Sequence, residues 1–318
     1  MADHAIEKDY GHKPVLLQEC LDALAIRPDG VYVDGTLGRA GHSLEIVRRL
    51  TEGGRLIGID RDQTAIDAAQ ERLAPYLDRV TLVHSNFDRI GDILADLHIS
   101  GVDGMLFDLG VSSPQLDDAA RGFSYMHDAP LDMRMDRTAP LTARDVVNDW
   151  PYEELRRILY DFGEERCAPA IARRIVQARD QAPIETTLQL VDIIKSAMPP
   201  AALREKQHPA KRSFQAIRIA VNGELDALPP MLEAAVSHLN AGGRLAVISF
   251  HSLEDRIIKK TMQELATGCT CPPNFPVCVC GKTPKIRLVS RKPIVSGDAE
   301  LAENPRARSA KLRVAEKL

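Results

Sequence analysis

Residues 31–43, VYVDGTLGRAGHS, join a short apolar strand to a turn with three glycines and to the start of a helix. Ligands of open α/β sheets bind at such turns, outside the carboxyl ends of the strands. Gly35, Gly38 and Gly41 permit unusual backbone angles and let the main chain approach a ligand closely. Many α/β proteins carry such glycines for packing alone, so the acid that precedes them, Asp34, is the more informative residue.

Asp34 and the glycine spacing favour a cationic ligand over a dinucleotide. A dinucleotide site offers amides and a helix N-terminus to a pyrophosphate, with glycines in the order G-x-G-x-x-G. Here the order is G-x-x-G-x-x-G, and a carboxylate at the strand end would repel a pyrophosphate. The same carboxylate suits the ammonium and sulfonium groups of S-adenosylmethionine. The turn therefore predicts an S-adenosylmethionine site, and a nicotinamide-dependent oxidoreductase on the same fold is the alternative.

Apolar runs and segments of helical period alternate in the N-terminal part of the chain, as in a parallel sheet with crossover helices. The predicted strands are 30–33, 55–59, 80–84, 102–108 and, much later, 243–250. The predicted helices are 41–50, 63–77, 151–160, 167–179, 187–197 and 228–239, the last followed by a turn at 240–242. Asp62 or Thr64 can cap the second of these helices.

The sheet pattern stops near Val111 and returns only near Gly243, which indicates a domain inserted into the sheet. We expect a Rossmann-like α/β domain of residues 1–115 and 215–318, interrupted by an all-helical domain at 116–214. With 318 residues and 44% hydrophobic content, the chain can form both cores. Its start lacks a secretory pattern and no apolar run approaches the roughly 18 residues of a membrane span, so we expect a cytoplasmic protein without a membrane partner.

The ends of the second and third predicted strands extend the site. Asp60 ends the second strand, where an acid accepts hydrogen bonds from both ribose hydroxyls. Phe87 follows the third strand and offers an apolar plate to adenine, or else packs into the core.

The fourth strand ends at Asp108, and the loop after it holds Ser112 and Ser113. Methyl transfer is an in-line displacement, so positioning of the acceptor matters more than a strong base. The amine of a nucleobase has its lone pair delocalised into the ring, so nearby groups must orient it and accept its proton. Asp108, Ser112 and Ser113 are therefore the candidate catalytic residues, with an ordinary turn as the alternative role of the two serines.

Several longer strings of residues occur together in this chain. They are DGT and GHS within 34–43, DLGVSSPQ at 108–115, PLDMRM at 130–135 and ISFHSLEDR at 248–256. These strings resemble the MraW (RsmH) family of class I methyltransferases, bacterial enzymes that modify the exocyclic N4 amine of one cytosine in the decoding region of 16S ribosomal RNA. The resemblance extends from His12 to near Lys311. It implies the same S-adenosylmethionine-dependent reaction with 16S ribosomal RNA as partner, free or within the small subunit, and it leaves the oligomeric state open.

The resemblance also assigns residues to the methyl donor. It implies S-adenosylmethionine contacts at Ala40, Gly41, His42, Asp60, Phe87, Asp108 and Gln115, which join Asp34 and Gly35 of the turn. The family often has glycine where Ala40 stands, and a methyl group is tolerated there if the main-chain amide does the binding. Like the family, this chain lacks the Asn/Asp-Pro-Pro-Tyr/Phe tetrapeptide of other amino methyltransferases, so no single catalytic base is assigned.

The predicted helical insertion resembles the family's substrate-recognition domain. Its basic side chains include Arg156, Arg157, Arg173, Arg174, Arg204, Lys206, Lys211 and Arg212. We expect a minority of them to contact ribosomal phosphates and the rest to be solvated. The target cytosine must leave its stack to meet the methyl group. Phe250 and His251 are candidates for the wall of its pocket, with a role in the core or in a turn as the alternative.

The C-terminal segment is basic although the whole chain has a net charge of −4. From Gly281 onward it has ten Lys or Arg and four Asp or Glu. Contact with phosphate is one role, and a solvated, partly disordered tail is the expected alternative.

Six cysteines occur, and four of them form a cluster, Cys269, Cys271, Cys278 and Cys280. The loop that they bracket can hold a tetrahedral zinc, although a one-residue spacer differs from the usual C-x-x-C knuckle. Reduced thiols in a turn or a labile disulfide are the alternatives, so metal binding stays open. Cys20 and Cys167 are isolated in helical segments and are expected to be small buried hydrophobes.

Two other functions remain open. A methyltransferase of the same fold acting on a DNA or protein amine is one, because the fold alone does not select the acceptor. A non-catalytic ribosome-binding factor is the other, and the acids at 34, 60 and 108 argue against it.

Overall fold

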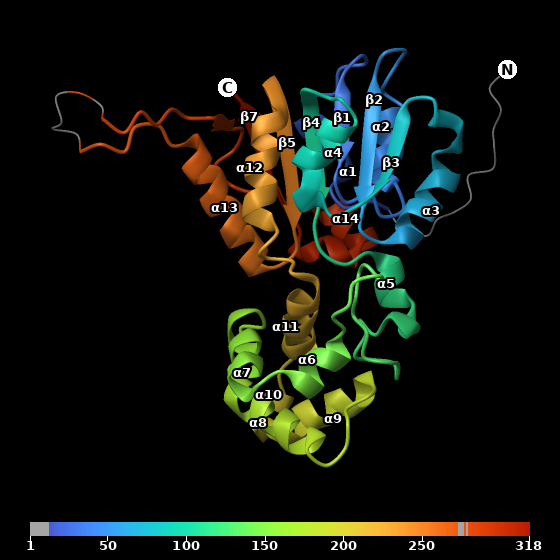
Figure 1. The fold of residues 1–318 in the computed structure, drawn as a ribbon, viewed down its shortest axis with the longest axis vertical. Coiled ribbons are helices and arrows are strands. Elements are labelled where there is room, and N and C mark those ends of the chain that lie inside the picture. Colours follow the sequence, from blue (N-terminus) through green and yellow to red (C-terminus); the bar gives the residue numbers. More distant parts are fainter. Residues whose placement is uncertain (1–12, 273–276, 278) are drawn as a thin grey trace. The chain divides into compact units, whose positions relative to one another are not determined.

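The computed structural model describes residues 13–272, 277 and 279–318, and the chain forms two compact units (Figure 1). One unit contains the chain up to Gly110 together with Ala227–Leu318. The other is Val111–Asp226 and interrupts the first in sequence. The chain therefore leaves one unit and returns to it once.

The second unit extends beyond the predicted insertion, 116–214, at both ends. Val111 packs against the core of the helical unit at its start. Ile217 and Val221 are buried in the same core near its end. The sequence pattern assigned these last residues to the sheet domain, because an apolar helix face does not reveal which core it packs against.

In the described residues of the first unit, seven strands form one sheet in the order β3-β2-β1-β4-β5-β7-β6. They are β1 (Val31–Asp34), β2 (Arg55–Asp60), β3 (Val80–His84), β4 (Val102–Asp108), β5 (Leu239–Ser249), β6 (Ile286–Leu288) and β7 (Lys311–Lys317). Neighbours from β3 to β5 are parallel, whereas β7 is antiparallel to both β5 and β6. The predicted Rossmann-like α/β class is confirmed, with the strand order reversing between β1 and β4.

Both faces of the central sheet are buried. Met105, Leu106 and Phe107 of β4 are all 0% exposed although successive side chains point to opposite faces. Burial on both faces explains the continuous apolar run that marks this strand in the sequence. Helices of this unit are α1 (Leu17–Leu24), α2 (Gly41–Val47), α3 (Gln63–Arg72), α4 (Ile90–Asp96), α12 (Leu228–His238), α13 (Ser252–Ala266) and α14 (Asp298–Glu303). Its 3-10 helices are Ala74–Tyr76, Phe87–Arg89 and Pro305–Ser309.

Two predicted boundaries differ from the structure for local reasons. The predicted helix 63–77 ends at Arg72, and a 3-10 helix with a proline in its first turn follows, because Pro75 has no N–H for a helix hydrogen bond. The helix begins at the predicted cap, since the Asp62 side chain accepts the N–H of Thr64 at 3.1 Å. The predicted turn at 240–242 lies within β5, beside a shift in register with β4.

The expectation of a partly disordered C-terminal tail is wrong. The segment forms β6, α14 and β7, and β7 is hydrogen-bonded between β5 and β6. Two of the cations of β7 are paired: Lys311 and Arg313 lie 3.1 Å and 2.7 Å from the carboxylate of Asp255 in α13. Because ion pairs of this kind neutralise the charges, a charged segment can form a strand that the sequence pattern does not reveal.

The second unit is helical. Its helices are α5 (Ser113–Asp117), α6 (Ala143–Asp149), α7 (Tyr152–Asp161), α8 (Ala168–Arg179), α9 (Thr187–Ala197), α10 (Pro200–Leu203) and α11 (Lys211–Asn222), with a 3-10 helix at Ala119–Arg121. Asn222 at the end of α11 accepts the N–H of Met135 and donates to the Met133 carbonyl, both at 2.8 Å. The PLDMRM string is thereby tied to the last helix of its own unit. Among the described residues, no helix combines the length and apolarity needed to span a membrane.

Candidate functional site

Three neighbouring strands each end in an aspartate. Asp34 ends β1 and lies in register with Gly58 of β2 and Leu106 of β4. Asp60 and Asp108 end those two strands, slightly farther along. Because parallel strands end at the same edge of a sheet, the three aspartates share one edge, at the point where the strand order reverses.

Asp34 is fully buried and organises the turn after β1. Its Oδ2 accepts the hydroxyl of Ser43 at 2.7 Å and its Oδ1 accepts the N–H of Thr36 at 3.2 Å. Burial raises the pKa of Asp34 to about 6, although these two hydrogen bonds lower it. The sequence interpretation missed Thr36 and Ser43. Hydroxyls within the DGT and GHS strings were the available signal, since buried carboxylates require donors.

Asp60 fastens the same turn from the neighbouring strand. Its Oδ2 accepts the N–H of Gly38 and its Oδ1 that of Asp62, both at 2.8 Å. Burial raises the pKa of Asp60 to about 6, against the two N–H donors that lower it, and the charges of Asp62 and Asp34 raise it further. Each carboxylate oxygen has a second lone pair, so Asp60 can still accept ribose hydroxyls.

Asp108 differs from the other two because one of its oxygens lacks a partner. Its main-chain N–H donates to the Thr36 hydroxyl at 2.5 Å, which joins β4 to the turn. Its Oδ1 is buried and has no hydrogen-bond partner among the described residues. Burial raises the pKa of Asp108 to about 6; the ring of His42 lowers it, and the charges of Asp34 and Glu254 raise it. A buried oxygen without a partner is costly, so a donor or cation reaching it is favoured.

His42 faces Asp108 from the start of α2. Its Nε2 lies 3.0 Å from the carbonyl oxygen of Val15, and its Nδ1 lies 3.9 Å from Oδ2 of Asp108. A carbonyl only accepts hydrogen bonds, so we assign the permanent proton to Nε2. The other ring nitrogen, Nδ1, then faces Asp108.

One glycine of the turn has the expected unusual backbone angle, and the other two have the packing role given as the alternative. Only Gly38 of the three has a positive φ, +50°. A Cβ on Gly35 would lie 2.2 Å from the ring of Phe107, and one on Gly41 would lie 2.5 Å from Pro14. Unusual backbone angles therefore do not explain Gly35 and Gly41, which are required by packing.

Ala40 carries a strained backbone at the N-cap of α2. Its φ is +57° and its side chain is fully buried. An L-residue in this region costs about 1–2 kcal/mol, and glycine avoids that cost. The conformation supplies a physical reason for glycine at this position in the family.

Phe87 serves the core on one side. Its ring packs edge-on against Phe107, with ring centroids 6.0 Å apart, and the residue is only half-buried. Core packing therefore accounts for part of its surface. The remaining exposed surface is available to an adenine ring, so the two roles expected from the sequence are compatible.

Ser112, Ser113 and Gln115 belong to the second unit, whereas the three aspartates belong to the first. The Ser112 N–H donates to Oε1 of Gln115 at 3.0 Å, which closes a capping box at the start of α5. The spacing S-x-x-Q is a sequence signal for such a box. Ser112 and Gln115 therefore have a local structural role in addition to any contact with ligands.

The ISFHSLEDR string joins the end of β5 to the start of α13. Glu254 accepts the N–H groups of Phe250 and His251 at 2.8 Å and 3.2 Å, and the His251 ring lies 3.2 Å from the same carboxylate. His251 and Glu254 form a capping box at the start of α13, so the structural role given as the alternative applies to His251. Phe250 lies beside the loop after β4, since a Cβ on Gly110 would be 3.7 Å from its ring.

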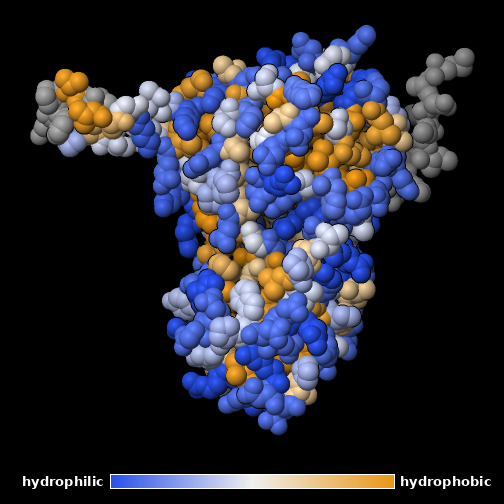
Figure 2. Space-filling model, in the orientation of Figure 1, coloured by the Kyte–Doolittle hydropathy of each residue, from blue (hydrophilic) through white to orange (hydrophobic). Residues whose placement is uncertain are grey.

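The basic side chains of the helical unit divide into two groups. Arg156, Arg157 and Arg212 form ion pairs with glutamates of their own unit, at 2.9, 2.7 and 3.5 Å. Arg174 donates to the Ser196 hydroxyl at 3.1 Å. The remaining four are exposed and form no ion pair with any described residue, and these are Arg173, Arg204, Lys206 and Lys211. Figure 2 shows that the visible surface of this unit is mostly hydrophilic.

The edge formed by the three aspartates fits S-adenosylmethionine. Carboxylates that are withheld from water gain most from a cationic ligand, and Asp108 also has an unsatisfied oxygen. The pyrophosphate of a dinucleotide would meet the same three negative charges. The arrangement therefore favours the methyl donor over a nicotinamide cofactor.

Known proteins resemble this chain over nearly its whole length. A ribosomal RNA small subunit methyltransferase H from Brevibacillus brevis is 59% identical over 309 residues, covering 97% of this chain and 98% of that protein. One from Paenibacillus sp. is 59% identical over 315 residues, covering 97% and 100%. A solved structure of a putative methyltransferase from Streptococcus mutans in complex with SAH has a TM-score of 0.45 at 11% identity and covers 96% of this chain and 100% of that one.

The family suggested by the sequence strings is found again by direct comparison. Residues 9–318 match the MraW methylase family, which includes the aspartate row, the turn with its glycines and the helical unit. The protein belongs to the MraW methylase family.

Proposed function

We propose that this chain transfers the methyl group of S-adenosylmethionine to the exocyclic N4 amine of one cytosine in the decoding region of small-subunit ribosomal RNA. The observation that carries the proposal is the row formed by Asp34, Asp60 and Asp108 at one sheet edge in a chain of the MraW methylase family. The ribosomal RNA acceptor is supported by relatives named ribosomal RNA small subunit methyltransferase H. The cytosine and its amine are supported by the sequence strings shared with the family.

The residues of the row have separate roles toward the methyl donor. Asp34 and Asp108 place negative charge beside its ammonium and sulfonium groups. Asp60 accepts the ribose hydroxyls, and Phe87 covers the adenine with its exposed surface. The donor is further contacted by Gly35, Ala40, Gly41 and His42 of the turn and by Gln115 of the second unit. Bound S-adenosylmethionine supplies an electrophilic methyl group on a sulfonium.

Asp108 also orients the acceptor amine. Its Oδ1 is buried without a partner and can accept an N–H of the cytosine amine. A pKa near 6 makes this carboxylate more basic than an ordinary aspartate, so it can accept the proton as the new N–C bond forms. Ser112 and Ser113 follow in the chain and are proposed to hold the base.

The helical unit is proposed to bind the ribosomal RNA. Its exposed cations without ion pairs, Arg173, Arg204, Lys206 and Lys211, are the best candidates for phosphate contacts. Cations already paired with glutamate would lose that pairing on binding phosphate. We propose that the reaction takes place in the cytoplasm and that the small ribosomal subunit is the partner.

The test is methyl transfer to defined acceptors. Small subunits and free ribosomal RNA from cells lacking this protein are incubated with the purified chain and labelled S-adenosylmethionine, and the product is mapped by mass spectrometry of nuclease fragments. We expect one methyl group on one cytosine, and a loss of about 100-fold or more in Asp108→Asn. Asp67→Asn, at an exposed position of α3, is the matched control and retains activity.

Three outcomes contradict the proposal. Labelled methyl groups on DNA or protein, with none on ribosomal RNA, would show that the enzyme has a different acceptor. Binding of ribosomal RNA without any methyl transfer would show that the protein is a non-catalytic factor. Calorimetry that detects NAD binding but no S-adenosylmethionine binding would indicate an oxidoreductase.

A further inference from the structure

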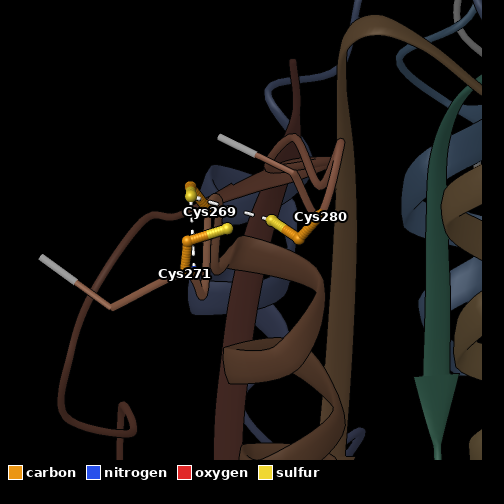
Figure 3. A group of neighbouring side chains, drawn as sticks. All are labelled: Cys269, Cys271 and Cys280. Atoms are coloured by element: carbon orange, nitrogen blue, oxygen red, sulfur yellow. Dashed lines mark hydrogen bonds between the residues drawn. The ribbon is translucent and has the colours of Figure 1, made fainter. Parts of the chain in front are cut away.

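Three cysteines converge at the base of a loop between α13 and β6 (Figure 3). Cys269 and Cys271 follow α13, and Cys280 precedes β6. Their Sγ atoms all lie within 4.8 Å of one another, and none of the three forms a disulfide. Neither the aspartate row nor the methyl transfer makes use of them.

The sulfur positions match thiolates around one metal ion. The Sγ atoms of Cys269 and Cys280 are 3.7 Å apart. Four thiolates at about 2.3 Å from a tetrahedral zinc have neighbouring sulfurs about 3.8 Å apart, whereas a disulfide brings two sulfurs to about 2 Å. The observed separation, at which Cys280 donates a hydrogen bond to Cys269, also fits two thiolates that share an ion. The one-residue spacer, which is unusual for a zinc knuckle, does not prevent this convergence.

Main-chain donors surround the same sulfurs. The N–H of Cys271 donates to Sγ of Cys269, and the N–H of Val279 donates to Sγ of Cys271, both at 3.4 Å. Hydrogen bonds of this kind stabilise negative charge on sulfur and orient it toward a metal. The second of these hydrogen bonds also connects the two arms of the loop, since Val279 lies on the arm that returns to β6.

The base of the loop holds the two arms together independently of the cysteines. The N–H of Lys285 donates to the carbonyl of Leu265 at 2.8 Å. A Cβ on Gly268 would lie 3.3 Å from the ring of Pro284, so the arms are also in close contact there. The sulfurs are therefore presented by a preformed neck, which lowers the cost of binding an ion.

We propose that Cys269, Cys271 and Cys280 bind one Zn²⁺ as thiolates, forming a structural site that fixes the loop between α13 and β6. Thiolates are soft ligands and select zinc among the common divalent ions with tetrahedral preference. Three thiolates leave one tetrahedral position for a further ligand. Cys278 is the remaining cysteine of this segment and lies outside the described residues.

The test measures metal in the full-length chain. Protein purified without chelator and passed through gel filtration is analysed by mass spectrometry for metals, and we expect about one zinc per chain. Single substitutions Cys269→Ser, Cys271→Ser and Cys280→Ser each remove most of the zinc. Cys167→Ser is the matched control, a half-buried cysteine on the other unit, and it keeps the full content.

A second measurement does not depend on the variants folding. Wild-type zinc is released with a mercurial reagent and counted with a coloured chelator. The mercurial is then removed from the cysteine sulfurs with excess dithiothreitol, the small molecules are removed by gel filtration, and cobalt is added to the reduced, metal-free chain. An intense thiolate-to-cobalt absorption supports the site, and its strength in Cys278→Ser reports the fourth ligand. Wild-type protein free of metal, with all exposed thiols reactive, overturns the proposal. A Cys269–Cys280 disulfide in a non-reducing peptide map also overturns it.

Discussion

The Nδ1 atom of His42 lies 3.9 Å from Oδ2 of Asp108, while the opposite ring nitrogen is held 3.0 Å from the Val15 carbonyl oxygen. The ring is thus fixed on one side and faces the carboxylate with the other. A charge on this ring lowers the pKa of Asp108, which burial has raised to about 6. His42 is therefore a residue that tunes Asp108, and substituting it should change a pH profile.

We predict that His42→Gln moves the acid limb of kcat/KM for S-adenosylmethionine to higher pH. Glutamine can still donate to the Val15 carbonyl, but it carries no charge, so Asp108 keeps its proton to higher pH. The measurement is kcat/KM from about pH 5 to about pH 8.5, which reports groups of the free enzyme. His84→Gln changes an exposed histidine bonded to the Arg61 carbonyl and leaves the limb in place. An unmoved limb in His42→Gln would show that the ring does not influence Asp108.

Asp108→Asn is expected to stabilise the ligand-free chain while abolishing its activity. The folded-state pKa of Asp108, about 6, lies above the unfolded value of 3.8, so its buried charge destabilises the fold at pH above 6. That destabilisation disappears as the pH falls from 6 toward 3.8, because both states then become protonated. A shift of this size corresponds to at most about 2–3 kcal/mol, less the effect of partial exposure to water.

Thermal unfolding of wild type and Asp108→Asn at two pH values checks this prediction. The variant should melt at higher temperature near neutral pH, and the difference should shrink near about pH 5 as wild-type Asp108 is protonated. Adding S-adenosylmethionine should raise the melting temperature of wild type much more than that of the variant. A variant that is less stable than wild type at neutral pH would mean that the Asp108 charge is already compensated in the free chain.

The sequence predicts the sheet core well because its signal is local. β3 and β4 have the predicted bounds, since each is a short segment rich in apolar residues, and α9 also has the predicted bounds. β7 was missed because Lys311, Arg313 and Glu316 give it the composition of a solvated tail. Their partners lie on other elements, and sequence patterns do not reveal pairing between distant residues.

The acids of the candidate site follow from the sequence, but their surroundings do not. An acid at the end of an apolar strand is visible as a pattern, and three such strands point to a shared edge. The left-handed backbone of Ala40, the contact between Gly35 and Phe107, and the position of the His42 ring all depend on tertiary packing. These features decide the charge state and shape of the site, so they required the structure.

Gly35→Ala should destabilise the chain more than Gly38→Ala and should also weaken S-adenosylmethionine binding. A Cβ at Gly35 meets the buried ring of Phe107 at 2.2 Å, and Phe107 in turn packs on Phe87. Overpacking of this kind costs about 1–3 kcal/mol and displaces the ring proposed to cover adenine. A Cβ at Gly38 has no atom closer than 4.0 Å, so only its φ of +50° is penalised, by about 1–2 kcal/mol.

Denaturant unfolding and calorimetric titration with S-adenosylmethionine distinguish these two glycine variants. We expect loss of affinity in Gly35→Ala, with Gly38→Ala closer to wild type. Equal affinities of the two variants for S-adenosylmethionine would show that Phe87 does not contact the adenine.

Neutralising the unpaired cations of the helical unit should weaken binding of ribosomal RNA without changing the KM for S-adenosylmethionine. Arg204, Lys206 and Lys211 are exposed, close in sequence and without ion pairs among the described residues. The triple change of these residues to Gln should reduce the salt dependence of log affinity by about 1 for each phosphate that the variant no longer binds. Arg156→Gln with Arg157→Gln is the matched control, because those side chains are paired with Glu153 and Glu154. Filter binding of small-subunit RNA over a series of salt concentrations gives both slopes. Cations that bind phosphate release counterions from the RNA, so their loss changes the slope of log affinity against log salt concentration. If this slope is the same for the two variants, another surface recognises the RNA, such as the basic segment after Gly281.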